Sequence, residues 1–235
     1  SLSLGVKIND DLKFIQNYFP NLTYNKIIKN NIPKMVAKLL SNKKNIVNLC
    51  YNKSEFAPRA LLYRSTLADS SSKKINNKIN KACGRNNEMP FAPVTIEEFA
   101  LDLFLDYKKS KECSRNMITT YFVTKEFMKN YPATMHKFIG SNKFTARPQV
   151  IKTNKKDLRW NIIKEYFNLT KRKSILNTSF NVHNSPIVTT SKDAIRTFIY
   201  MGLKDSYLLL DNVLISYNNN FNYFQSLREK IRSEP

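Results

Sequence analysis

The sequence predicts an α/β fold with a mixed sheet, because segments of helical and of strand character alternate along the whole chain. The chain has 235 residues and is 42% hydrophobic, which is enough to bury a sizeable core. No apolar run approaches the ~18 residues that a membrane-spanning helix needs, so no membrane partner is expected. No internal repeat or linker divides the sequence, and a single domain over residues 1–235 is therefore expected.

Residues 1–44 are expected to form a helical lead-in, which precedes a buried strand over residues 45–50. The helical pattern is clearest where apolar residues share one face at i, i+3, i+4, i+7 and i+8, namely Ile32, Met35, Val36, Leu39 and Leu40. Residues 69–88 are rich in Ser, Asn and Lys. Only Ile75 and Ile79 repeat there at helical spacing, which predicts an exposed helix and loop.

The middle of the chain is predicted to hold a strong helix and a strand. Thr95 and Glu98 have the spacing of a capping box, which places a helix over residues 96–109. Residues 117–123 are rich in β-branched and aromatic side chains, and this composition is typical of a strand.

The last third is predicted to contain two capped helices. Asp157 begins an amphipathic helix over residues 158–169, and Thr190 opens a second helix with Asp193 at its third position. Gly202 ends that second helix. Four short strands and a polar tail that is expected to fray complete the chain, at residues 174–176, 187–189, 207–210, 213–215 and 217–235.

The net charge of the chain is strongly positive. Lys plus Arg is 39 and Asp plus Glu is 18, so the formal charge is 39 − 18 = +21. Such a balance points to a polyanionic partner, such as a nucleic acid, an anionic surface or a phosphorylated ligand. Drift towards A/T-rich codons, which encode Lys, Asn, Ile and Tyr, is the alternative explanation, because the lysines are scattered rather than gathered in a tail.

The cysteine, histidine and glycine content excludes several classes of protein. Cys50, Cys83 and Cys113 are widely spaced and form no CxxC pair, so neither a disulfide framework nor a zinc site is expected. A reducing cytoplasm is the expected location. The two histidines are 47 positions apart, at 136 and 183, and predict no metal site within this chain. The four glycines are dispersed, which excludes a P-loop and a dinucleotide-binding loop.

Three polar segments are unusual for purely structural sequence. The first, residues 55–65, carries Arg59 and Arg64 beside a Pro turn, and the second surrounds Arg147. The third, residues 176–182, is a run of Asn, Thr and Ser that follows a predicted strand. Guanidinium groups and turn amides together suit a phosphorylated ligand at strand ends. Surface ion pairs for the arginines, and a turn whose side chains bond their own backbone, are the structural alternatives.

Four ordered motifs resemble those of the C-terminal, YrdC-like domain of O-carbamoyltransferases of the nodulation-protein and antibiotic-biosynthesis type. Residues 55–69 (EFAPRALLYRSTLAD) resemble the family's EFGPRALGxRSxLAD, and residues 90–93 (PFAP) resemble the end of FRPFAP. Residues 132–149 are similar to PAxxHxDGTARxQ with extra residues inserted, and residues 176–195 are similar to LNTSFNxxGEPIVxTPxDAI. The motifs cover about residues 45–215 in the family's order.

The resemblance implies a YrdC-like twisted, open, mixed sheet flanked by helices. It also implies a domain that binds ATP with Mg²⁺ and carbamoyl phosphate and forms a carbamoyl-adenylate. In the family, a larger N-terminal transferase domain, which uses iron or another divalent metal, passes the carbamoyl group to a hydroxyl acceptor. The sequence begins with Ser rather than Met and lacks that domain, so this chain is expected to be the second half of such an enzyme.

The ligand residues that the resemblance implies are Arg59, Lys81, Arg85, Arg147, Asn177, Ser179 and Asn181. Arg85 belongs to a KxR element whose lysine is replaced by Cys83, and Lys81 is expected to take its place. Met89 stands where the family has the arginine of FRPFAP. Ala57 and the pair Asn184 and Ser185 replace the glycine of FGPRA and the Gly-Glu of the GEP turn. The lost cations predict weak ATP binding or a changed ligand.

Adenylate formation spreads negative charge over phosphoryl oxygens, so arginines and Mg²⁺ suffice and no acid–base pair is required. Two other functions remain open. One is a nucleic-acid-binding module on the same scaffold, for which Tyr166 and Phe167 lie near the basic run at 171–173. The other is a scaffold without catalysis that only supports a partner domain.

Overall fold

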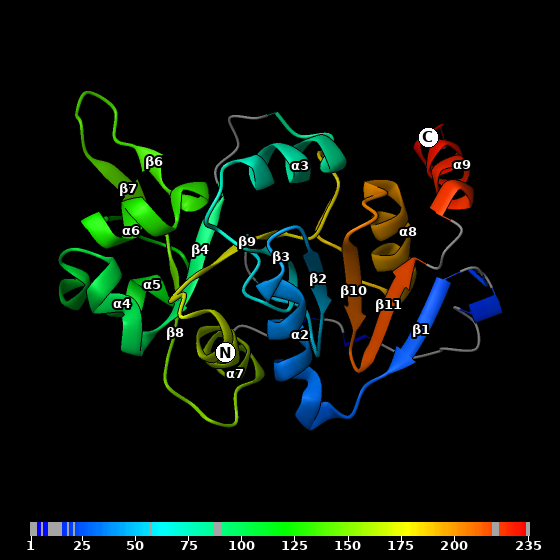
Figure 1. Ribbon diagram of the computed structural model, residues 1–235, viewed down its shortest axis with the longest axis horizontal. Helices are drawn as coiled ribbons and strands as arrows, with labels where there is room; N and C mark the ends of the chain where they lie inside the picture. The colour runs from blue at the N-terminus through cyan, green and yellow to red at the C-terminus, as the bar shows by residue number, and fades with distance from the viewer. Residues whose placement is uncertain are drawn as a thin grey trace.

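An eight-stranded mixed sheet forms the centre of the fold in the computed structural model, with the strand order β1-β11-β10-β2-β3-β9-β4-β8 (Figure 1). The structure describes residues 4–5, 7–8, 16–17, 19–20, 22–56, 58–86, 91–217 and 221–233. The strands of this sheet are β1 (Leu22–Lys26), β2 (Ile46–Cys50), β3 (Arg64–Ala68), β4 (Ala92–Ile96), β8 (Gln149–Ile151), β9 (Ile175–Ser179), β10 (Ser206–Leu210) and β11 (Val213–Tyr217). The pairs β10–β2 and β4–β8 are parallel and the other pairs are antiparallel, which confirms the predicted mixed sheet.

A smaller antiparallel sheet lies beside the first, in the order β5-β7-β6. Its strands are β5 (Tyr121–Phe122), β6 (His136–Lys137) and β7 (Phe144–Ala146). The helices are α2 (Ile32–Ser41), α3 (Lys74–Cys83), α4 (Glu97–Leu103), α5 (Lys111–Ser114), α6 (Lys125–Asn130), α7 (Leu158–Thr170), α8 (Ser191–Met201) and α9 (Phe221–Ser233), with single 3-10 turns at Lys29–Asn31, Tyr107–Lys109 and Pro132–Thr134. None of the described helices is long and apolar enough to cross a membrane.

Both faces of the large sheet are buried, because alternate residues of its central strands enter different cores. Along β2, Val47 and Leu49 pack in one core with α2 and α7, whereas Ile46 and Cys50 pack in the other with α8 and α9. Figure 1 shows α2 and α7 side by side over the middle of the sheet, and α8 beside α9 near β10 and β11. Helices therefore flank the sheet, as predicted.

Several predicted elements are confirmed together with their caps. The helix after Asp157 begins as expected, since this carboxylate accepts from the Arg159 backbone N–H at 2.9 Å. The capping box of Thr190 and Asp193 is present at the start of α8, and Gly202 ends that helix at a φ of +55°. The strand over residues 45–50 and the helix of Ile32 are also present, as β2 and α2.

Two predictions at the ends of the sequence are wrong in part. The lead-in 1–44 contains strand β1, which pairs residue by residue with β11 and buries Leu22. The tail 217–235 contains helix α9, which is anchored because the Phe224 ring packs at 4.9 Å from the Tyr217 ring and Arg228 donates to the Tyr200 carbonyl. Tertiary contacts, rather than local pattern, determine both elements.

The middle of the sequence also differs from the prediction. Thr95 lies in β4 and donates to the Lys173 carbonyl, so it caps no helix, and α4 spans only Glu97–Leu103. The predicted strand over 117–123 is reduced to β5, and residues 187–189 are not a strand. The helix predicted within 69–88 is present as α3, but its apolar residues are buried against α8, as Ile79 shows with 0% exposure.

Candidate functional site

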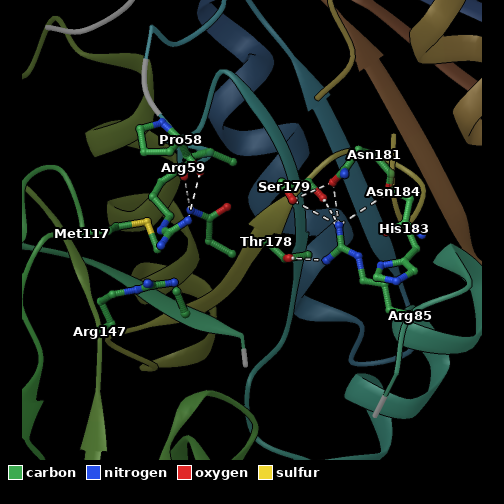
Figure 2. A pocket seen from close by; sticks show the side chains of 13 residues that line it. Pro58, Arg59, Arg85, Met117, Arg147, Thr178, Ser179, Asn181, His183 and Asn184 are labelled. Carbon is green, nitrogen blue, oxygen red and sulfur yellow. Dashed lines mark hydrogen bonds between the residues drawn. The ribbon is translucent and has the colours of Figure 1, made fainter. Parts of the chain in front are cut away.

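A pocket of about 460 Å³ opens at the edge of the large sheet where β9 ends and where β4 and β8 begin (Figure 2). Segments that are far apart in the sequence form its wall: the loop before β3, the turn after α3, the link between β7 and β8, and the end of β9. The lining residues are Pro58, Arg59, Ala60, Arg85, Ala92, Met117, Arg147, Asn177, Thr178, Ser179, Asn181, His183 and Asn184.

The pocket is strongly cationic. Arg59, Arg85 and Arg147 all line it, and no Asp or Glu is among its described lining residues. Burial lowers the pKa of Arg147, and the nearby positive charge of Arg59 lowers that pKa further. These two guanidinium groups therefore repel each other across a space that an anion can fill.

The two arginines have few partners in the protein. The Arg147 Nε atom is buried without a hydrogen bond, and within the described part of the chain no ion pair or hydrogen bond reaches this guanidinium group. Arg59 is exposed, and its one hydrogen bond to a described residue is donated to the neighbouring Pro58 carbonyl, at 3.2 Å. Figure 2 shows both side chains on the same side of the pocket, near Met117. Most of their N–H donors are thus free for a ligand.

Arg85 is held on the opposite side of the pocket by the chain itself. Its Nη1 donates to the Thr178 hydroxyl at 2.8 Å, and its Nη2 donates to the Ser179 hydroxyl at 3.1 Å and to the Asn181 side-chain oxygen at 2.6 Å. The Ser179 hydroxyl in turn donates to the same Asn181 oxygen at 2.6 Å. Arg85 therefore shapes the wall after β9 more than it offers donors to a ligand.

Asn177 ties two walls of the pocket together. This residue is 1% exposed, and its amide donates to the Ala60 carbonyl at 3.0 Å and to the Gln149 side-chain oxygen at 3.2 Å. The loop that carries Arg59 is thereby bonded to strand β9, and β9 to the start of β8.

The structure brings together all of the predicted ligand residues except Lys81. That lysine is exposed in the last turn of α3, outside the residues that line the pocket. The replacement of the KxR lysine by Lys81 is therefore not supported, since helical geometry directs its side chain to solvent. Met89 and Ala57 lie outside the described residues.

Sequence reasoning missed several lining residues. Met117 reaches the pocket from the segment between α5 and β5, and its backbone has a φ of +57°, which is unusual for a residue with a side chain. His183 and Thr178 also line the pocket, and both fall inside the motif over residues 176–195. Nothing in the sequence marks Met117, but the two motif positions were identifiable.

The aromatic and basic residues proposed for nucleic-acid stacking are engaged elsewhere. Tyr166 is fully buried, and its hydroxyl donates to Asp69 at 2.5 Å. The Arg172 guanidinium group forms an ion pair with the same carboxylate. Burial raises the pKa of Tyr166, with the Asp69 charge as the next cause. This ring cannot stack on a base, which contradicts that detail of the prediction.

No metal centre is evident in the described ranges: they contain no group of three or more His, Cys, Asp or Glu side chains placed to hold an ion. Another hollow, of about 360 Å³, lies between the first turn of α2 and the loop before α7. Its lining includes four lysines, Lys29, Lys34, Lys155 and Lys156, together with Glu165.

Comparison with known proteins follows the same segments. The family described as carbamoyltransferase C-terminus matches residues 37–217. The protein MJ1058 of Methanocaldococcus jannaschii is 36% identical over 168 residues, which are 71% of this chain and 26% of that protein. Nodulation protein NolO of Bradyrhizobium diazoefficiens is 32% identical over 161 residues, which are 67% of this chain and 28% of that protein. The chain thus spans about a quarter of the length of these relatives.

A solved structure supports the fold. Full-length HypF, in a phosphate- and nucleotide-bound form, matches with a TM-score of 0.50 and 15% identity, over 83% of this chain and 22% of that one. This likeness concerns the fold, and it confirms the predicted YrdC-like arrangement.

Proposed function

Because this chain belongs to the carbamoyltransferase C-terminus family, we propose that its cationic pocket binds ATP with Mg²⁺ and carbamoyl phosphate and forms a carbamoyl-adenylate. The observation that carries the proposal is the pair Arg59 and Arg147, which face a pocket whose described lining has no acidic residue and which have almost no partners within the described ranges. HypF, which has the same fold over 22% of its chain, has been solved in a phosphate- and nucleotide-bound form, and this is compatible with the proposal.

The reaction consumes ATP, carbamoyl phosphate and water, and yields the carbamoyl-adenylate, pyrophosphate and phosphate. Water first releases carbamate and phosphate from carbamoyl phosphate, and a carbamate oxygen then attacks the α-phosphorus of ATP as pyrophosphate leaves. Arg59 and Arg147 hold phosphoryl oxygens and stabilise the charge that develops on them. Arg85, Ser179 and Asn181 keep the wall after β9 in place, and Asn177 holds the Arg59 loop against it.

The pocket residues fit Mg²⁺ only as a companion of ATP. The lining offers amide and hydroxyl oxygens from Asn177, Thr178 and Ser179 but no carboxylate, and Mg²⁺ prefers charged oxygen ligands. The ion would enter on the phosphates of ATP and supply further charge neutralisation there.

The partner of this domain in the proposal is a larger transferase domain, in the same or a separate chain. Such a domain would accept the carbamoyl-adenylate and use iron or another divalent metal to pass the carbamoyl group to a hydroxyl.

The three cysteines are free thiols, which supports a reducing cytoplasm as the location.

The test is pyrophosphate release by the chain in the presence of ATP, Mg²⁺ and carbamoyl phosphate. Release should require both substrates and should fall ~10²–10³-fold in Arg147→Ala, because one charge clamp is lost. Arg115→Ala is the matched control, since Arg115 pairs with Glu112 outside this pocket and its loss should leave the rate unchanged. Equal rates with and without carbamoyl phosphate would contradict the proposal, and no binding or release at all would favour a scaffold without catalysis.

A second candidate function is binding of a nucleic acid. The observation in its favour is the hollow that Lys29, Lys34, Lys155 and Lys156 line, on a chain of net charge +21. Filter binding to RNA at increasing salt concentrations tests it. A steep fall of the binding constant with salt, lost when these lysines are replaced by Ala, supports this function, and salt-independent binding contradicts it.

A further inference from the structure

The loop that carries Arg59 is organised by a carboxylate of its own chain. One oxygen of Glu55, Oε1, accepts from three backbone N–H groups: Leu61 at 2.6 Å, Tyr63 at 2.9 Å and Arg64 at 3.0 Å. The remaining N–H of this run, that of Leu62, donates to the Ser65 hydroxyl at 3.1 Å. Four consecutive amides before and at the start of β3 are therefore satisfied by side chains.

This arrangement is a backbone nest, the kind of concavity that binds an anion, and its anion is Glu55. The nest depends on Leu62, which has a φ of +66° although it is not glycine and is fully buried. A residue with a side chain keeps such a conformation only where its surroundings determine it strongly. The carboxylate of Glu55 is the group that gathers the amides on both sides of Leu62.

The nest lies directly after the residues that line the pocket. Pro58, Arg59 and Ala60 form the pocket wall, and the first amide held by Glu55 is that of Leu61. The same loop is also tied by the Asn177 amide, which donates to the Ala60 carbonyl, and by Arg159, which donates to the Leu61 carbonyl at 3.3 Å. Among the residues that the structure describes, the Arg59 side chain bonds only to Pro58, so these contacts do not fix its place.

We propose that Glu55 is a positioning residue of the anion site, which acts by closing the nest and so presents the Arg59 guanidinium group to the pocket. The inference rests on the proposed function only in that the pocket takes a phosphorylated ligand. It explains why the motif over residues 55–69 contains a glutamate as well as two arginines. Arg64 serves the same loop from the other side, since its buried guanidinium group donates to the Tyr51 and Tyr63 carbonyls.

A role in stability alone makes a different prediction from a positioning role. If Glu55 acts through Arg59, removal of Glu55 weakens ligand binding only in a chain that still contains Arg59. If Glu55 merely stabilises the fold, its removal and the removal of Arg59 act independently. A double-mutant cycle separates the two cases.

The experiment is calorimetry of the 235-residue chain with inorganic pyrophosphate, using the unaltered protein, Glu55→Ala, Arg59→Ala and the double variant. We expect each single change to weaken pyrophosphate binding by about tenfold or more, as for the loss of a hydrogen bond to a charged group. The double variant should bind within about twofold of Arg59→Ala. If the double variant loses affinity by the product of the two single losses, the inference is overturned.

Three further variants keep the test decisive. Glu55→Gln retains an oxygen that can accept from the same three amides, so it should bind within about threefold of the unaltered chain. If Glu55→Ala fails to fold, Glu55→Asp replaces it in the cycle, because its shorter carboxylate cannot reach all three amides. Glu98→Ala removes a surface glutamate that pairs with Lys164 at 2.6 Å, and it should change nothing. If Glu55→Gln binds pyrophosphate as weakly as Glu55→Ala, the role assigned to the hydrogen bonds between this side chain and the three amides is overturned.

The outcomes also separate this inference from the proposed function. The double variant could bind pyrophosphate as well as Arg59→Ala does while the unaltered chain releases no pyrophosphate from ATP and carbamoyl phosphate. That result would overturn the proposed function and leave Glu55 as a positioning residue. If the unaltered chain releases pyrophosphate but the losses of binding affinity multiply in the double variant, the Glu55 inference alone is overturned. Absence of pyrophosphate binding by the unaltered chain would overturn both.

Discussion

The two sides of the pocket contain the same type of side chain in opposite circumstances. On one side the Arg85 guanidinium group is surrounded by acceptors from the end of β9, including the Asn181 oxygen at 2.6 Å. On the other side Arg59 and Arg147 lie near each other, and burial and then the charge of Arg59 lower the pKa of Arg147. The first arrangement stabilises the pocket through bonds within the protein, and the second is stabilised only by a bound anion.

This difference teaches that the number of arginines in a pocket does not measure its capacity for a ligand. A guanidinium group has five N–H donors, and those already bonded within the protein are lost to a phosphate. Arg85 directs both terminal nitrogens at its own chain. The available charge is therefore concentrated at Arg59 and Arg147, and each prediction below tests that asymmetry.

The largest effect is expected for Arg147→Ala. Binding of ATP and of carbamoyl phosphate should weaken about 100-fold or more, because a half-buried cation whose buried Nε atom has no partner is the strongest donor left for the ligand. Stability should stay within about 0.5 kcal/mol or rise, because no bond within the protein is lost and repulsion with Arg59 is relieved. Calorimetry and denaturant melts measure the two quantities. A large loss of stability with unchanged affinity would reverse the assignment of the two sides.

Arg85→Ala should show the opposite balance. Several charge-assisted hydrogen bonds disappear: the Thr178 hydroxyl loses its Arg85 partner, and the Asn181 oxygen keeps only the Ser179 hydroxyl, so stability should fall by about 2 kcal/mol. Affinity for carbamoyl phosphate should fall by about tenfold, as an indirect result of a looser wall. Urea denaturation with both variants, Arg85→Ala and Arg147→Ala, compares them directly. Equal stability of the two variants would contradict the asymmetry.

Local sequence pattern predicted much of the fold. The capped helices after Asp157 and Thr190 were predictable because their signals lie within four residues. Strand β1 and helix α9 were not, because their stability comes from β11 and α8, which are distant in the sequence. Thr95 shows the limit of a local motif, since the tertiary bond to the Lys173 carbonyl prevails over the capping box.

The candidate site shows a similar division. The family resemblance identified Arg59, Arg147 and Asn177, and the pocket contains all three. The sequence could not show that Arg85 is bonded to its own chain, because the acceptors are 93 to 96 residues away. Availability of a donor depends on distances to acceptors, and these exist only in the folded chain.

A smaller effect is expected at His136, which senses the arginine side of the pocket. Burial lowers the pKa of His136 from its ordinary 6.5, a bond to the Phe91 carbonyl raises it, and the Arg147 charge lowers it. NMR titration should show that this pKa rises in Arg147→Ala and also when carbamoyl phosphate binds, since both reduce the local positive charge. Arg85→Ala should change the His136 pKa less than Arg147→Ala does.

The His136 shift also has a sign for stability. A histidine with a lowered pKa in the folded state binds its proton more weakly there than in the unfolded chain. Its contribution to stability is therefore present above the unfolded pKa of about 6.5 and is lost as the pH falls through that value towards the folded pKa. Arg147→Ala should flatten this acid-side loss in urea melts between about pH 5 and 7. An unchanged slope would place the Arg147 charge too far from the ring to matter.

The smallest effect is expected for Lys81→Ala, and a lack of change in ATP affinity would itself be informative. The family resemblance suggested that this lysine replaces the lost cation at Cys83, whereas the structure leaves it exposed on α3, outside the pocket lining. At ~0.15 M salt an exposed charge is screened beyond about 8 Å, so affinity for ATP should change by less than about twofold. Lys81→Glu should behave almost alike, because only a screened charge is reversed. A tenfold loss in either variant would mean that α3 moves to bring Lys81 to the ligand, and the cationic side of the pocket would then extend beyond Arg59 and Arg147.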